Sequence, residues 1–214
     1  MIFSMPISMQ TSDRDHSSQL RSVYWSKLAA SAHPTRIAAC LDPTLSAATV
    51  VQLQTCARLQ PKLAELLLDN DTDSNGCGWG PDLLKGHDPR RAALFAGSVW
   101  HARSLLKLVS QRHLTVLVEH IGADAHAFGI RHLAYAITGN LIADPKKLAL
   151  QIEHDGHACL GAWLDQSPVL ERNRVLLRLP LGTAAENPAP EHGNASGQLF
   201  SLVLAHFETE IPAL

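Results

Sequence analysis

Apolar residues recur every three or four positions along much of the chain, and this spacing is typical of helices that bury one face. The pattern is clearest in 89–111, where it predicts one helix with a continuous buried face. The residues on that face are Phe95, Val99, Ala102, Leu106 and Val109. A second helix is expected to follow and to end at Gly122, so that 89–121 forms a tight helical hairpin.

Similar spacing continues in 125–136 and 145–163, and 18–31 and 44–68 also have helical patterns. For 199–207 the pattern fits either a helix or a short strand. Leu and Ala supply most of the apolar residues, while aromatic residues make up only 5%, and this mixture suits helix packing better than sheet packing. We therefore predict an all-α or mainly α fold, built as a single-domain array of helical hairpins.

Four dipeptides have the chemistry of helix starts. Each places a side-chain oxygen before a proline, whose missing N–H costs nothing at the first helical position. They are Asp42-Pro43, Asp88-Pro89, Asp144-Pro145 and Ser167-Pro168. Helices are expected to begin at these four prolines.

The two ends of the helical region differ from it in composition. Residues 8–19 are rich in Ser, Asp and Gln, and 183–198 are rich in Pro, Gly, Asn and Ala, so neither stretch should contribute much to a core. We expect a disordered N-terminus over 1–19, one helical domain over 20–182, a flexible loop over 183–198 and a C-terminal element over 199–214.

Charge and apolar runs exclude several classes of protein. The chain has 18 Lys and Arg against 20 Asp and Glu, so it lacks the positive excess that would bind nucleic-acid phosphates, and no nucleic-acid partner is expected. No run of about 18 apolar residues suggests a membrane-spanning helix, and the apolar opening lacks the length and basic flank of a secretory signal. Four widely spaced cysteines are expected to be free thiols in the cytoplasm.

One acidic stretch has the alternating oxygen ligands of an EF-hand-like calcium loop. Its candidate ligands are Asp71, Asp73, Asn75 and Asp82. The twelfth position holds Asp rather than the longer bidentate Glu, and a proline precedes it, which favours an acidic surface loop instead. A calcium- or metal-regulated binding protein is therefore the second interpretation, and the leading one assigns no metal and no cofactor.

The histidines offer two further kinds of site. His154 and His157 are spaced to share one helix face and could hold zinc or nickel, but no third ligand can be identified. A general base could come from one of four other histidines, although no nucleophile motif or phosphate loop accompanies them. These are His101, His120, His126 and His132. A small helical enzyme with a histidine base is the third interpretation, and the leading one names no catalytic residue.

A basic stripe follows the helix that is predicted to bury Phe95 and Val99. It consists of Arg103, Lys107 and Arg112. Such a stripe is either a solvated face or a docking site for an acidic partner surface, so these three residues are the candidate partner-binding residues.

Three stretches carry a resemblance to a known family: LFAGSVWHARSL at 94–105, LVEHIG at 117–122 and AFGIR at 127–131. They are similar to the central helices of the SctK (YscK/PscK-like) accessory proteins of bacterial type III secretion, in the version found in Hrp-type systems of plant-associated bacteria. The chain length fits, and the order of elements fits over 35–180.

The resemblance implies a non-enzymatic cytosolic adaptor of the secretion sorting platform, peripheral to the inner-membrane face of the apparatus. Its expected partners are the cytoplasmic domain of the membrane-ring component and the SctQ-like pod protein, which it would link without inserting into the membrane. The resemblance assigns no catalytic or ligand-binding role to any individual residue.

Overall fold

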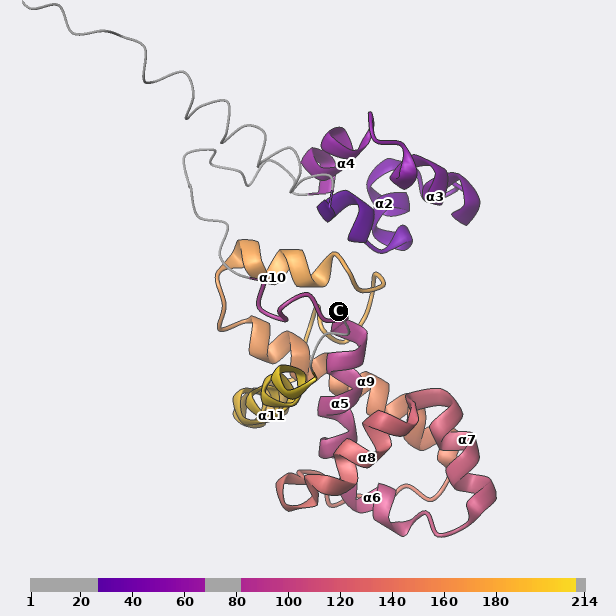
Figure 1. The fold of residues 1–214 in the computed structure, drawn as a ribbon, viewed down its shortest axis with the longest axis vertical. Helices are drawn as coiled ribbons and strands as arrows, with labels where there is room; N and C mark the ends of the chain where they lie inside the picture. The colour runs from indigo at the N-terminus through magenta and orange to yellow at the C-terminus, as the bar shows by residue number, and fades with distance from the viewer. Residues whose placement is uncertain (1–26, 68–81, 211–214) are drawn as a thin grey trace, which may run out of the picture. The chain divides into compact units, whose positions relative to one another are not determined.

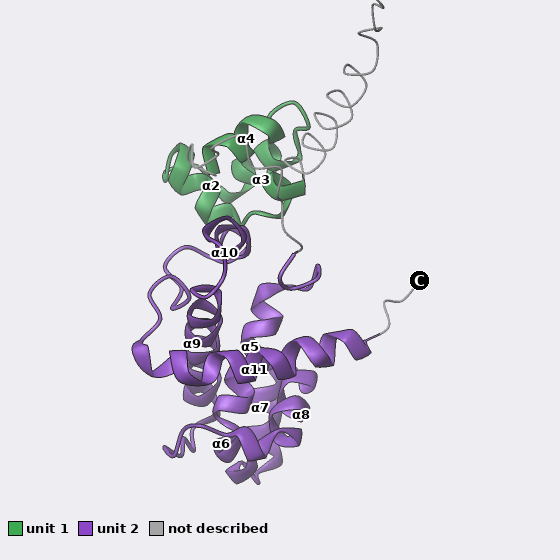
Figure 2. Ribbon diagram, turned by 90° about the vertical axis from the view of Figure 1, so that its left-hand side faces the viewer, with its two compact units in different colours: residues 1–78 green, residues 79–214 purple. Residues whose placement is uncertain are grey.

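The computed structural model describes residues 27–67 and 82–210, and all regular secondary structure in these residues is helical (Figure 1). The prediction of an all-α fold is therefore confirmed for the described part of the chain. The chain divides into two compact units, Met1–Gly78 and Trp79–Leu214, where one domain was expected (Figure 2). The boundary falls in an Asp- and Gly-rich sequence that offers few apolar side chains to a shared core.

The first unit is a small group of short helices. Residues 27–31 are helical and are followed by α2 (Pro34–Leu41), α3 (Ala47–Thr55) and α4 (Gln60–Leu67). Ile37, Val50 and Leu63 are buried between these helices. The buried amide of Gln54 donates hydrogen bonds to the carbonyls of Ala29 (3.2 Å) and Ala32 (2.8 Å). It thereby provides partners for carbonyl groups at the C-terminal end of the helix that ends at residue 31.

The helix start expected at Pro43 is wrong. Asp42 ends α2, and its Oδ1 accepts hydrogen bonds from the backbone N–H (2.8 Å) and the hydroxyl (2.7 Å) of Thr44, which close a turn instead. The next helix begins after Ser46, whose hydroxyl accepts from the backbone N–H of Thr49 (3.1 Å). The expected helix over 44–68 is therefore divided into α3 and α4.

The second unit is larger and is built around a central pair of helices. It contains α5 (Pro89–Trp100), α6 (Ala102–Lys107), α7 (Gln111–Ile121), α8 (Ala123–Arg131), the short 3₁₀ helix η1 (Leu133–Tyr135), α9 (Pro145–Leu164), α10 (Val169–Leu176) and α11 (Pro190–Thr209). The central pair is α5 and α9; α11 packs against both, α8 packs against α5, and α7 packs against α9 (Figure 1). None of the described helices is both long and apolar enough to cross a membrane.

Two of the predicted helix starts position the central pair. Asp88 caps α5 by accepting a hydrogen bond from the N–H of Arg90 (2.9 Å), and Asp144 caps α9 by accepting from the N–H of Lys147 (2.8 Å). Both prolines occupy the first helical turn, as predicted. The start at Ser167 is displaced by one residue, since Pro168 is the N-cap and α10 begins at Val169.

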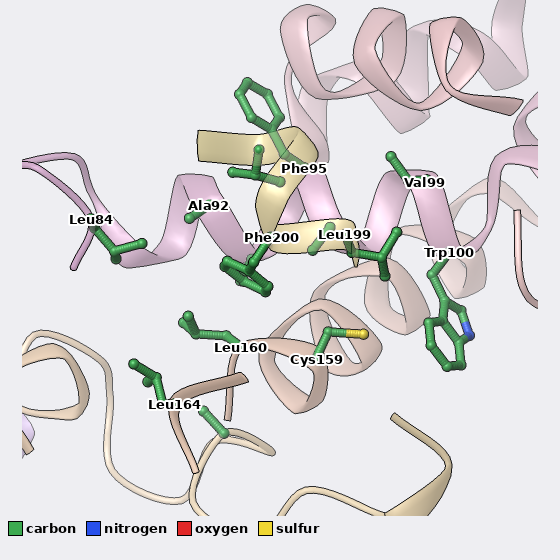
Figure 3. Close-up of a cluster of buried hydrophobic side chains, with 14 of the residues drawn as sticks. Leu84, Ala92, Phe95, Val99, Trp100, Cys159, Leu160, Leu164, Leu199 and Phe200 are labelled. Atoms are coloured by element: carbon green, nitrogen blue, oxygen red, sulfur yellow. The ribbon is translucent and has the colours of Figure 1, made fainter. Parts of the chain in front are cut away.

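The main core lies where α5, α9 and α11 meet. Its buried members include Phe95 and Val99 of α5, Leu160 of α9 and Phe200 of α11, which are labelled in Figure 3. A second cluster joins α6, α7 and α9. Its buried members are Leu105, Leu117, Ile121, Leu148, Ala149 and Ile152.

The crossing of α5 and α9 is close enough for the two backbones to touch. A Cβ atom added at Gly97 would lie 2.0 Å from the carbonyl oxygen of Ile152, and one added at Gly156 would lie 2.1 Å from that of Ala93. Glycine is therefore required at both positions, because any side chain would separate the central helices.

The helix predicted over 89–111 breaks at His101. Phe95, Val99 and Ala102 are buried as expected, but a separate helix, α6, begins after His101, and Leu106 of α6 and Val109 of the following turn are exposed. The hairpin predicted over 89–121 is therefore wrong, since α7 packs mainly against α9 and α8 rather than against α5.

The flexible loop predicted over 183–198 is wrong in its second half. Helix α11 begins at Pro190 and runs to Thr209, which also shows that 199–207 is helical. Two glycines suggested a loop, but His192, Ser196 and Leu199 form a buried stripe at helical spacing. Packing of this stripe against the core outweighs the weak helix propensity of the glycines.

Candidate functional site

An open groove of about 410 Å³ lies in the second unit, between the α6–α7 turn and the segment that precedes α9. It is lined by Lys107, Leu108, Val109, Ser110, His113, Leu141, Ile142 and Ala143. Five of these eight residues are apolar, so the groove offers an apolar surface to a ligand or partner.

The α6–α7 turn forms one wall because it is short. Helix α6 ends at Lys107 and α7 begins at Gln111, so the apex of the turn is Val109, whose exposed fraction is 91%. Leu108 is partly buried and packs against the second core cluster, as Ile142 does from the opposite wall. The groove therefore has a floor fixed to the core and an exposed apolar rim.

The opposite wall is held in place by Ser104, a fully buried residue of α6. Its hydroxyl donates a hydrogen bond to the carbonyl of Asn140 (3.2 Å) and accepts one from the N–H of Ile142 (3.2 Å). A further bond joins the N–H of Thr138 to the carbonyl of Trp100 (3.2 Å). The extended segment that carries Leu141 is thus attached to α5 and α6 through its backbone.

Replacing Ser104 by alanine is expected to loosen this wall. The backbone groups of Asn140 and Ile142 would lose their side-chain partner, at a cost of about 1–3 kcal/mol where they stay shielded from water. Hydrogen exchange measured by NMR should show a faster amide exchange at Ile142. The matched control is Ser201→Ala, which removes an exposed hydroxyl bonded to the carbonyl of Gly197 and should leave the Ile142 amide unchanged. Equal exchange at Ile142 in both variants would contradict this role of Ser104.

The basic residues predicted to bind a partner adjoin this groove. Lys107 lines it, Arg103 lies one helical turn earlier on α6, and Arg112 precedes the lining residue His113. All three are exposed, and no ion pair joins any of them to another residue in the described ranges. Arg91, in contrast, forms a two-pronged ion pair with Glu210 (2.5 and 2.6 Å).

Sequence reasoning identified the charges of this site but not its apolar part. Val109 was expected to be buried, and Leu141 and Ile142 were not singled out. A signal was present, because Ser110 can cap a new helix at Gln111 and so place Val109 in a turn. The observed Ser110 occupies the N-cap position without a side-chain capping bond.

A buried polar cluster joins three elements of the same unit. Asp155 of α9 accepts a hydrogen bond from Nε2 of His101 (2.7 Å), which lies at the α5–α6 break. Nε2 of His192, on α11, lies 3.5 Å from the other carboxylate oxygen. The Asp155 carboxylate also accepts bonds from the Gln151 amide (3.1 Å) and from Nδ1 of His154 (3.0 Å). Only His154 of these histidines is exposed.

The carboxylate of this cluster is stabilised in its charged form. Burial by itself would raise the pKa of Asp155, but the hydrogen bonds from His101, His154 and Gln151 outweigh it and hold the pKa well below the usual range of an aspartic acid. An ionised Asp beside an imidazole is the arrangement that orients a catalytic base. Here, however, His101 and His192 are each only 2% exposed, and Nδ1 of His101 has no hydrogen-bond partner among the described residues.

The other histidines named as candidate bases lie elsewhere. His120 is exposed and its Nδ1 bonds to the Val116 carbonyl (2.8 Å), while His132 bonds to the Phe128 carbonyl (2.9 Å). Burial lowers the pKa of His126. The structure does not bring any of these three into the cluster around Asp155.

The candidate metal sites find little geometric support among the described residues. Asp71, Asp73 and Asn75 lie outside these residues, while Asp82 closes a turn by accepting bonds from the N–H groups of Leu84 (3.1 Å) and Gly86 (2.8 Å). Within 27–67 and 82–210, no three His, Cys, Asp or Glu side chains are grouped as a metal would require. Burial also raises the pKa of the Cys159 thiol, which keeps it protonated at neutral pH.

Comparison with known proteins finds two curated relatives that match over nearly the whole chain. Nodulation protein NolU of Sinorhizobium fredii (strain NBRC 101917 / NGR234) is 77% identical over 208 residues, which cover 97% of this chain and 98% of the relative. Nodulation protein NolU of Rhizobium fredii is 76% identical over 208 residues, with the same coverage. No family model matches, and no solved structure matches.

Proposed function

Because this chain belongs to the family of the rhizobial nodulation protein NolU, we propose that it serves nodulation as a non-enzymatic adaptor that binds other proteins. More specifically, it would act in the sorting platform of a type III secretion apparatus, at the cytoplasmic face of the inner membrane. Its partners there would be the cytoplasmic domain of the membrane-ring component and the SctQ-like pod protein. The similarity of 94–131 to the SctK proteins supports this finer assignment.

The observation that carries the proposal is the groove beside the α6–α7 turn. An apolar patch with a charged rim is the usual composition of a protein interface. Val109 and Leu141 supply exposed apolar surface, while Arg103, Lys107 and Arg112 supply charges that are not used within the described unit. Val109 and Leu141 lie at the same groove rather than singly on the surface, and an exposed apolar patch of this kind indicates an interaction site.

The position of the buried histidines also supports an adaptor rather than an enzyme. A general base must reach its substrate within hydrogen-bonding distance. His101 and His192 lie inside the packed unit, and neither lines the groove. Their contacts with Asp155 join three helices, which is a structural use of the cluster.

Co-purification from rhizobial cells tests the proposal. Tagged protein should recover membrane-ring and pod components, identified by mass spectrometry, and Val109→Ser with Leu141→Ser should reduce their recovery by about tenfold, the loss expected when one apolar contact worth roughly 1.4 kcal/mol is removed. A calcium chelator should change nothing.

The matched control is Val169→Ser with Leu181→Ser, which removes similar apolar side chains of 64% and 53% exposure elsewhere in the second unit. This control should recover the partners like the natural protein. Recovery of no secretion component by the natural protein, or recovery only in the presence of calcium, would refute the adaptor proposal.

A further inference from the structure

The groove is preformed and small. Leu108 and Ile142 pack against the core, and Ser104 holds the wall that carries Leu141, so little ordering is needed when a ligand enters. Its volume of about 410 Å³ is at the lower end of the range for ligand pockets, which is roughly 300–1,000 Å³. It therefore has room for a few apolar side chains of a peptide rather than for the face of a folded domain.

Cations predominate around the groove, and the acidic residue that follows its lining residue Ala143, Asp144, caps α9. Among the described residues that line it, the ionisable ones are Lys107 and His113, and Arg103 and Arg112 stand beside them. The N-terminal end of α7 also lies at the groove, and the side chain of Ser110 does not cap it. Its free N–H groups add positive potential to that of the cations.

The small apolar groove and the cations around it indicate which kind of partner it can bind. We infer that the groove binds an extended acidic segment of a partner protein, with one bulky apolar side chain held between Val109 and Leu141 and carboxylates paired with Arg103, Lys107 and Arg112. The inference rests on the proposed function, and it deepens that function by naming what the groove recognises. An anionic membrane would also meet the charges, but a recessed floor fits an inserted side chain better than a bilayer surface.

Binding of synthetic peptides to the full-length protein tests this inference. The probe is a peptide of about ten residues, long enough to span roughly 30 Å, with one leucine flanked by glutamates. Two control peptides replace its glutamates by lysines or its leucine by serine. Fluorescence anisotropy should show that each control binds at least about tenfold more weakly, which is roughly 1.4 kcal/mol. Affinity for the acidic peptide should also fall as salt rises.

Charge reversal in the protein provides a gain of function. Arg103→Glu with Lys107→Glu should weaken the acidic peptide by about tenfold or more and should strengthen the lysine peptide, because opposite charges then meet. The matched control is Lys27→Glu with Arg58→Glu, two exposed residues of the other unit, which changes the net charge equally and should alter neither affinity. Amide shifts in NMR spectra of the natural protein should concentrate at 107–113 and 141–143.

Several outcomes would overturn the inference. Equal binding of all three peptides, or shifts away from the groove, would refute it, as would tight binding to vesicles with about 30% phosphatidylserine when the acidic peptide does not bind. In cells, the Val109→Ser, Leu141→Ser variant could lose its secretion partners while the Arg103→Glu, Lys107→Glu variant keeps them. This result would support the adaptor function but refute the inference that the partner segment is acidic.

Discussion

Gly97→Ala is expected to destabilise the second unit by about 3 kcal/mol or more, at the upper end of what overpacking costs. The added Cβ would lie 2.0 Å from the carbonyl oxygen of Ile152, which is backbone and cannot rotate away as a side chain can. Helices α5 and α9 would have to separate, and the core cluster that contains Phe95 of α5 and Leu160 of α9 would lose packing contacts between the two helices. Urea denaturation followed by circular dichroism measures the loss, which is a large fraction of the stability of an ordinary domain.

Gly197→Ala is the matched control for this substitution. Gly197 is also within a helix, but nothing lies within 4 Å of a Cβ added there. The same chemical change should therefore stabilise the protein by about 0.5–1 kcal/mol, because alanine is the better helix former. Similar unfolding midpoints for the two variants would show that the α5–α9 crossing tolerates a methyl group.

The parts of the fold that were predicted correctly depend on local chemistry. Asp88 and Asp144 bond to N–H groups two and three residues ahead, so the sequence near each helix start contains all the information. Gly122 likewise ends α7, as the sequence predicted, and its positive φ of 85° is one that glycine adopts readily.

The incorrect predictions concern helix ends whose positions depend on contacts with residues far away in the sequence. Apolar spacing through 89–111 gave no sign of a break, yet His101 leaves the helical path where its ring meets Asp155, more than fifty residues away. The start of α11 was read as a loop because its burial depends on packing against α5 and α9. Periodicity identifies helices, but their ends follow from contacts that no local window contains.

In the candidate site, too, the features that depend on local sequence were predicted and those that depend on distant contacts were not. The three cations were found because charge at helical spacing is visible in the sequence. The apolar groove was missed because its two walls are separated in the sequence by the whole of α7 and α8, and the hydrogen bonds of Ser104 that link them join residues 36 and 38 positions apart. The cluster around Asp155 was missed for the same reason, since His192 belongs to a segment expected to be a loop.

Asp155→Ala is expected to destabilise the protein by about 1–3 kcal/mol or more, because a buried hydrogen-bonding group that loses its partner costs this much. It would leave Nε2 of His101 without its acceptor inside the unit and remove the group that lies between α9 and His192 of α11. Asp155→Asn keeps the size of the side chain and one carbonyl oxygen as an acceptor, so it should lower the free energy of unfolding less than Asp155→Ala does. The control is Asp165→Ala at the end of the same helix, which breaks an exposed ion pair with Arg172 (3.1 Å) and should cost less than about 1 kcal/mol.

The pH dependence separates the charge of Asp155 from its packing. Its pKa in the folded protein lies below that of an unfolded aspartate, which is about 3.9, so between these two values the unfolded chain binds more protons. The stabilisation is therefore complete above the unfolded pKa and is lost as the pH falls through the folded one. Urea denaturation between pH 7 and about pH 3 should show the natural protein losing more stability than Asp155→Asn, so that the gap between them narrows in acid. A gap that stays constant over this range would mean that Asp155 acts through shape and neutral hydrogen bonds, and that its charge contributes nothing to joining α9 to the α5–α6 break.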